Sequence, residues 1–226
     1  GVASPDKEMH KKISGREGIR TVELKIERRI SLFKDLWSLI KLYLLFRKEK
    51  PDIVHSLTPK AGLLSMLAAR LARVPVRIHT FTGLIFPWEN GQMSKLLKIM
   101  DRVTCMAATT VIPEGEGVRR DLEDICPTNK LSKVLANGNI NGVNLEYFRP
   151  VPTVSDDAVT RFIFVGRLVR DKGIEELKGA FERLDNAQLI LVGSFEQDLD
   201  PLSNTCMEWV RNSRQVINVG FQDDIR

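Results

Sequence analysis

Hydrophobic positions in the first half of the chain switch between helical and strand-like spacing. Apolar residues recur at helical spacing over 30–50, and Pro51 follows the charged end of this segment, so an amphipathic helix is predicted there. Residues 52–56 predict a short strand, 63–72 a helix and 76–81 a second strand. A strand, a helix and a strand within about 30 residues form the unit from which parallel sheets are built.

The same alternation continues to the end of the chain. Further strands are predicted at 21–26, 109–112, 131–135, 162–165, 187–192 and 216–219, and further helices at 92–107, 118–124, 174–184 and 207–212. Residues 150–157 contain two prolines and no periodicity, which predicts a linker. The predicted fold class is therefore α/β, with two Rossmann-like parallel-sheet domains at residues 1–149 and 150–226.

Composition and charge restrict the choice of partners only weakly. Apolar residues make up 43% of the chain, charged residues 28%, and the formal net charge is +5. This small surplus would suit nucleic acid, an anionic membrane surface or phosphorylated substrates. The sequence has no RNA-binding signature, no zinc-finger spacing and no basic run of five or more residues. Nucleic acid is therefore not an expected partner.

The cysteines and histidines form no recognisable site. The cysteines are far apart, odd in number and outside any CxxC pair, which indicates reduced thiols and a cytoplasmic location: Cys105, Cys126 and Cys206. The histidines are also dispersed, so no metal site is expected: His10, His55 and His79. The chain opens without an initiator Met or a signal-peptide pattern, and no apolar run reaches 18 residues.

The loop between the strand at 162–165 and the helix at 174–184 carries the most informative chemistry. Gly166 allows a sharp turn, and Arg167 and Lys172 place two cations where ligands bind in parallel sheets, at the carboxyl ends of strands. A guanidinium and an ammonium group suit an anionic ligand such as a diphosphate. A solvated loop whose charges have no function is the alternative interpretation.

Three sequence blocks occur in a recognisable order. Residues 51–71 read PDIVHSLTPKAGLLSMLAARL, residues 141–150 read NGVNLEYFRP, and residues 164–173 read FVGRLVRDKG. Together they resemble the characteristic blocks of GT4-type retaining glycosyltransferases, including bacterial polysaccharide and capsule enzymes. The resemblance implies the GT-B fold, with an acceptor-side domain followed by a domain that binds the donor nucleotide.

The resemblance also implies a reaction. A hexosyl unit would pass with retention from a nucleotide-diphosphate sugar to a glycan or polyprenyl-linked acceptor, without a cofactor or bound metal, in surface polysaccharide synthesis. Gly166, Arg167 and Lys172 would bind the donor's diphosphate. Thr82 and Gly83 fall in a loop that faces the cleft, where many members carry a histidine before the glycine. No catalytic residue can be assigned.

The family's first strand and its EX7E motif have no counterpart in the chain. Both domains are therefore expected to be incomplete, and the chain is expected to be an internal fragment that is inactive by itself. A nucleotide-sugar 2-epimerase and a non-catalytic nucleotide-binding fragment remain as alternative functions.

Two further features allow two interpretations each. Lys60 follows a predicted strand and could meet a phosphate of a lipid-linked acceptor, or could be an ordinary exposed lysine. The helix at 30–46 carries Trp37 among leucines with lysines beside them. It could lie on an anionic membrane, at the inner face of the plasma membrane, or could pack its apolar face on the first sheet. His79 is expected to be a core histidine.

Overall fold

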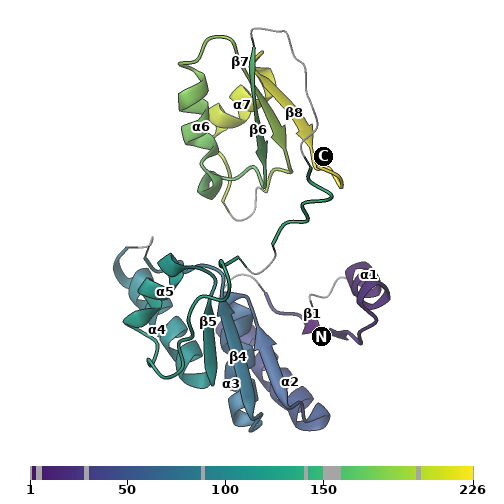
Figure 1. The fold of residues 1–226 in the computed structure, drawn as a ribbon, viewed down its shortest axis with the longest axis vertical. Coiled ribbons are helices and arrows are strands. Elements are labelled where there is room, and N and C mark those ends of the chain that lie inside the picture. The colour runs from purple at the N-terminus through teal and green to yellow at the C-terminus, as the bar shows by residue number, and fades with distance from the viewer. Residues whose placement is uncertain are drawn as a thin grey trace. The chain divides into compact units, whose positions relative to one another are not determined.

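The computed structural model describes most of the chain in two compact units. It describes residues 2–3, 7–27, 31–87, 90–139, 142–149, 159–196 and 200–225. The units are Gly1–Gly142 and Val143–Arg226, each with a three-stranded parallel sheet (Figure 1). The division falls shortly before the predicted boundary at 149/150, and the linker predicted at 150–157 lies outside the described residues.

The first unit is built on three parallel strands in chain order. These are β3 (Ile53–Ser56), β4 (Val76–Phe81) and β5 (Thr110–Pro113). Parallel neighbours require crossover connections, and α3 (Pro59–Leu71) and α4 (Gly91–Ala107) provide them. The predicted βαβ unit is thereby confirmed.

The remaining elements of this unit lie outside the three-stranded sheet. They are β1 (Val2–Ala3), α1 (Lys7–Glu17), β2 (Val22–Glu23), α2 (Leu32–Glu49) and α5 (Glu116–Glu123). β1 and β2 pair in parallel as a separate two-stranded sheet, so the strand predicted at 21–26 is reduced to two residues.

Two predictions in the first unit are wrong for local reasons. The helix predicted at 63–72 begins earlier, at Pro59, because proline suits the first helical position. The strand predicted at 131–135 is a single bridge between Leu131 and Val111. Pro113, two residues further along β5, has no N–H with which to continue this ladder.

Helix α2 is apolar on two opposite faces. Leu42 and Phe46 are buried in the core that α2 shares with α3. Phe33 and Trp37, on the other face, are 88% and 59% exposed. Of the two interpretations of this helix, the one in which it packs an apolar face inside the protein therefore holds for one face only. Among the described residues, no helix combines the length and the apolar character needed to cross a membrane.

His79 of β4 lies in the core of the first unit, as the sequence predicted. Its side chain is 1% exposed, and its Nδ1 lies 2.7 Å from the hydroxyl of Ser56. The backbone of α3 approaches the ring so closely that a Cβ on Gly62 would lie 2.2 Å from the ring carbon Cε1. Burial, with the nearby His55 as a second cause, lowers the pKa of His79 to about 4.

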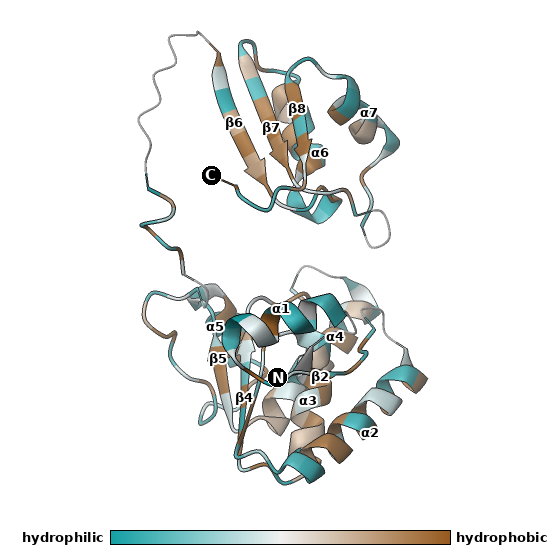
Figure 2. Cartoon of the chain, turned by 90° about the vertical axis from the view of Figure 1, so that its right-hand side faces the viewer, coloured by the Kyte–Doolittle hydropathy of each residue, from teal (hydrophilic) through white to brown (hydrophobic). Residues whose placement is uncertain are grey.

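The second unit repeats the same construction. β6 (Thr160–Val165), β7 (Ala187–Val192) and β8 (Val216–Gly220) form a parallel sheet, connected through α6 (Ile174–Phe181) and α7 (Asn204–Asn212). The strands and helices predicted here are confirmed, with shifts at their ends. Figure 2 shows hydrophobic residues concentrated along these strands.

Replacing Gly62 by alanine should destabilise the first unit. The new methyl group would overlap the His79 ring, so α3 must move from the sheet, at a cost of about 1–3 kcal/mol. Chemical denaturation would measure the loss. Gly117 in α5 has no atom within 4 Å of a built Cβ, so Gly117→Ala is the matched control and should be neutral or stabilising. Equal stability of the two variants would contradict the close approach.

The buried His79 should make the protein less stable as the pH falls below 6.5. The unfolded state takes up a proton there, while the folded state, with a pKa of about 4, does not. Asp101 acts in the opposite sense, because burial raises its pKa to about 6. In Asp101→Asn, the unfolding free energy should therefore fall by about 2 kcal/mol between pH 7 and pH 5. A His79 ring that protonates near pH 6.5 by NMR would contradict this account.

Candidate functional site

The carboxyl ends of β6, β7 and β8 meet at one edge of the second sheet. The N–H of Gly166 donates to the carbonyl of Val192 at 2.9 Å, and the N–H of Gly193 donates to that of Gly220 at 2.8 Å. A Cβ on Gly193 would lie 1.9 Å from the carbonyl oxygen of Gly166, and its φ is +147°. Only glycine allows this approach, which brings the loops after β6 and β7 together.

A cavity of about 320 Å³ opens at this edge. Its described lining comes from all three strand ends: Val165, Gly166, Arg167, Val192, Gly193, Ser194, Phe221, Gln222 and Ile225. The walls are largely apolar, and Arg167 is the charged member of this lining. Small-molecule sites commonly have this size and this combination of apolar walls with few polar groups. Ligands of parallel sheets bind at such edges.

Arg167 lies between two carboxylates. Its Nη1 donates a hydrogen bond to Oε2 of Glu196, and its Nη2 lies 3.9 Å from Oδ2 of Asp171. The hydrogen bond to Glu196 is the main cause of a raised pKa for Arg167, so the guanidinium stays fully charged. Half of the side chain remains exposed and accessible to a ligand.

Lys172 lies on the 3-10 helix Arg170–Lys172, just before α6 begins. Its Nζ is 3.9 Å from the same Asp171 oxygen that Arg167 faces, so the two cations are at most twice that distance apart. Gly173 then turns the chain with φ +74°. The structure thus gathers the three predicted residues of this loop, although Lys172 is not among the described residues that line the cavity.

Glu196 was missed by sequence reasoning. It follows β7 and is distant in sequence from Arg167. A parallel bridge between Leu168 and Phe195 aligns the two loops. No motif in the sequence indicates this pairing, because it depends on the registration of two loops.

The candidate residues of the first unit lie near the carboxyl ends of β3 and β4. Thr82 and Gly83 follow β4 and are exposed, and the prediction that their loop faces a cleft stays a prediction. Lys60 is not an ordinary exposed lysine. Its Nζ lies 2.6 Å from Oδ1 of Asp35 in α2, and both side chains are only 16% exposed. This ion pair links α2 to α3.

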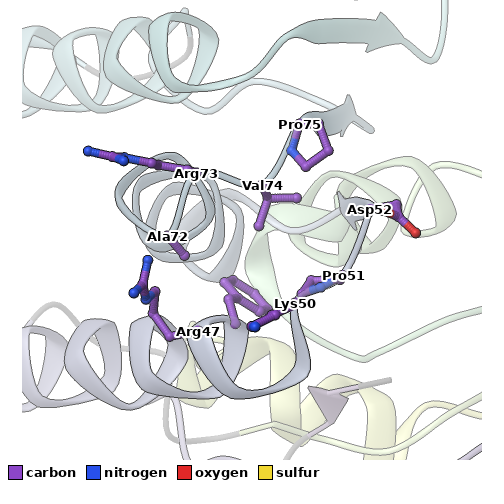
Figure 3. Close-up of a pocket in the computed structure, with 9 residues that line it drawn as sticks. Arg47, Lys50, Pro51, Asp52, Ala72, Arg73, Val74 and Pro75 are labelled. Atoms are coloured by element: carbon purple, nitrogen blue, oxygen red, sulfur yellow. The ribbon is translucent and has the colours of Figure 1, made fainter.

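A second cavity, of about 330 Å³, lies at the opposite edge of the first sheet. Figure 3 shows Arg47 and Lys50 reaching it from the end of α2, and Arg73 in the turn after α3. Lys50 and Arg73 have positive φ values of 47° and 63°. Cations at these positions complement the negative carbonyl ends of α2 and α3, and this interaction explains the basic residues without any ligand. This cavity is therefore not the candidate site.

Comparisons with known proteins identify a family for this chain. Residues 1–114, just over half of the chain, match the family described as Glycosyl transferase 4-like. The capsular polysaccharide biosynthesis glycosyltransferase CapM of Staphylococcus aureus is 35% identical over 186 residues, which are 76% of this chain and 49% of CapM.

Two further proteins extend the comparison. UDP-Gal:alpha-D-GlcNAc-diphosphoundecaprenol alpha-1,3-galactosyltransferase of Escherichia coli is 37% identical over 131 residues, 57% of this chain and 33% of that enzyme. The crystal structure of Anabaena Alr3699/HepE in complex with UDP-glucose matches with a TM-score of 0.71 at 17% identity, over 98% of this chain and 61% of that chain.

The chain spans half or less of the length of these two relatives from S. aureus and E. coli. Its two parallel-sheet units and the likeness to Alr3699/HepE show the GT-B fold. The match over residues 1–114, together with the 35% identity to CapM over 76% of this chain, identifies the chain as a member of the glycosyl transferase 4-like family.

Proposed function

We propose that the protein transfers a hexosyl unit, with retention, from a nucleotide-diphosphate sugar to a glycan or lipid-linked acceptor in surface polysaccharide synthesis. The observation that carries the proposal is Arg167 at the rim of an apolar cavity at the carboxyl edge of the second sheet. The names of the relatives support the setting, since CapM belongs to capsular polysaccharide biosynthesis. The E. coli relative is named for a UDP-galactose donor and a diphosphoundecaprenol-linked acceptor.

The donor would lie with its nucleoside in the cavity and its diphosphate toward Arg167 and Lys172. Apolar walls formed by Val165, Val192 and Phe221 suit a flat base, while phosphate oxygens suit the planar fork of a guanidinium. Negative charge grows on the diphosphate as its bond to the sugar breaks. Two cations placed there stabilise this charge more in the transition state than in the ground state, which lowers the barrier.

The acceptor would approach from the first unit. The exposed loop at Thr82 and Gly83 follows β4 and is our candidate for lining the acceptor side. Lys60 would need to exchange its ion pair with Asp35 for an acceptor phosphate. We therefore prefer the Thr82–Gly83 loop to Lys60 as the part of the first unit that contacts the acceptor.

Contact with an anionic membrane through α2 would bring the protein to a lipid-linked acceptor. Phe33, Trp37 and Leu44 form an exposed apolar stripe at helical spacing. Lysines 34, 41 and 48, spaced by seven residues, follow one border of this stripe. Basic helices with exposed aromatic residues bind anionic interfaces in two ways: the aromatic side chains bury apolar area in the lipid, and the basic side chains are attracted to the anionic headgroups.

Removing either phosphate-binding cation should abolish most donor turnover. Arg167→Ala and Lys172→Ala should each lower kcat/KM of the intact protein by at least about 100-fold, because each removes charge stabilisation at the leaving group. Arg183→Ala, an exposed arginine after α6, is the control and should retain activity.

Steady-state assays with analysis of the products would test this prediction. A new glycosidic bond with the donor's anomeric configuration is expected by NMR. Normal kcat/KM in both variants would refute the phosphate assignment. A free sugar or an epimer formed without acceptor would instead identify a nucleotide-sugar 2-epimerase, and turnover of neither kind would leave a nucleotide-binding fragment.

The α2 stripe should decide binding to anionic vesicles. The intact protein should co-sediment with phosphatidylglycerol vesicles, and Phe33→Ser/Trp37→Ser should weaken this binding at least tenfold, because two exposed aromatic side chains lose their burial in lipid. Ile19→Ser, which replaces an exposed apolar side chain outside α2, is the control. Vesicle binding that is absent, or unchanged in the double variant, would show that the stripe packs against protein.

A further inference from the structure

The guanidinium that we assign to the donor's diphosphate already has an anionic partner in the second unit. Arg167 Nη1 donates to Oε2 of Glu196 at close range. The Glu196 side chain is 23% exposed and that of Arg167 is 50% exposed, and Arg167 lines the cavity. The hydrogen bond is strong enough to be the main cause of the raised pKa of Arg167.

The backbone places Glu196 at this point. The N–H of Leu168 donates to the carbonyl of Ser194 at 2.9 Å, and Leu168 forms a parallel bridge with Phe195. Leu168 is 1% exposed, and Phe195 packs against the same core. Arg167 and Glu196 each adjoin a residue of this bridge, on the same side of the two paired segments, so the alignment of the two loops brings their side chains within reach of each other.

A carboxylate and a phosphate make the same demand on an arginine. Each offers two oxygens to the planar fork of N–H groups, and each is anionic. Oδ2 of Asp171 lies 3.9 Å from Nη2 of Arg167, which is beyond hydrogen-bond distance, so Glu196 is the carboxylate that engages the fork. A diphosphate that binds Arg167 must therefore replace Glu196 as its partner.

We propose that Glu196 is an exchange partner of Arg167: it holds the guanidinium in the donor-free protein and yields it to the donor's diphosphate. The inference rests on the proposed function, since it takes Arg167 as the diphosphate ligand. Every ligand that uses Arg167 bears the cost of displacing Glu196, while a nucleoside without phosphate does not. After transfer, Glu196 recaptures Arg167 and so promotes release of the nucleoside diphosphate product.

The substitution Glu196→Gln distinguishes this exchange from a purely structural role of Glu196. Glu196→Gln keeps the size of the side chain and removes its charge. Calorimetric titration of the intact protein with UDP, GDP and ADP should give a Kd for the nucleoside diphosphate that binds, and this Kd should fall at least fivefold in the variant. Binding of the matching nucleoside should not change. The inhibition constant of the same diphosphate as a product inhibitor should fall by the same factor.

The controls isolate the pair. In Arg167→Ala, adding Glu196→Gln should bring no further tightening, because the partner for which Glu196 competes is gone. Glu182→Gln removes an exposed carboxylate of the same unit, paired with Lys178, and should leave the Kd unchanged. Glu196→Ala should tighten binding in the same direction, which keeps the test open if the glutamine variant does not fold.

Three outcomes would overturn the proposal. Weaker diphosphate binding in Glu196→Gln would mean that Glu196 only orients Arg167 for the donor. Weaker binding of the nucleoside would mean that Glu196 contacts the nucleoside itself. An unchanged Kd would mean that the pair is irrelevant to the donor. Failure of the proposed function looks different: the unmodified protein would bind none of the three diphosphates, or Arg167→Ala would bind as tightly as the unmodified protein.

Discussion

The close approach of two loops at the carboxyl edge of the second sheet is the constraint on which the site depends. Gly193 passes so near the carbonyl oxygen of Gly166 that no side chain fits between them. This approach continues into the bridge between Leu168 and Phe195, which brings Arg167 and Glu196 together. One steric condition thus determines the shape of the cavity and the partner of its cation.

The cations of this loop are balanced by carboxylates. Arg167 faces Glu196 and Asp171, and Lys172 faces the same Asp171 oxygen. Exposed ion pairs of this kind contribute little to stability, since water screens them. In the proposed function, these pairs position the cations before a phosphate arrives, and the carboxylates set a threshold for the anions that can bind.

The first unit shows how packing uses a polar side chain. His79 is accommodated in the core because Gly62 lets α3 approach the ring and Ser56 provides a hydrogen-bond partner for Nδ1. The imidazole remains neutral at physiological pH, since burial lowers its pKa. Lys60 is similar in that its charge is paired with Asp35 between two helices. Residue types that suggest chemistry in the sequence serve here to connect elements.

Much of the architecture could be predicted from the sequence. The alternation of periods predicted the strands β3, β4, β6, β7 and β8 and the helices between them, because buried parallel strands and amphipathic helices have distinct spacings. The glycine and the two cations of residues 166–172 predicted an anion site at the end of β6, because parallel strands present their carboxyl ends at one edge. The loop at 131–135 was mistaken for a strand, since its apolar residues could not reveal that Pro113 ends the ladder.

Only the tertiary structure decided which charges meet. Sequence spacing places Arg167 and Lys172 in one loop, but the pairing of Arg167 with Glu196 depends on two loops aligned through Leu168 and Phe195. It also decided that Lys60 pairs with Asp35, and that α2 buries Leu42 while leaving Phe33 exposed. The local sequence determines the spacing of apolar side chains and the charge of each polar one. Which side chains become partners depends on contacts between segments far apart in the chain.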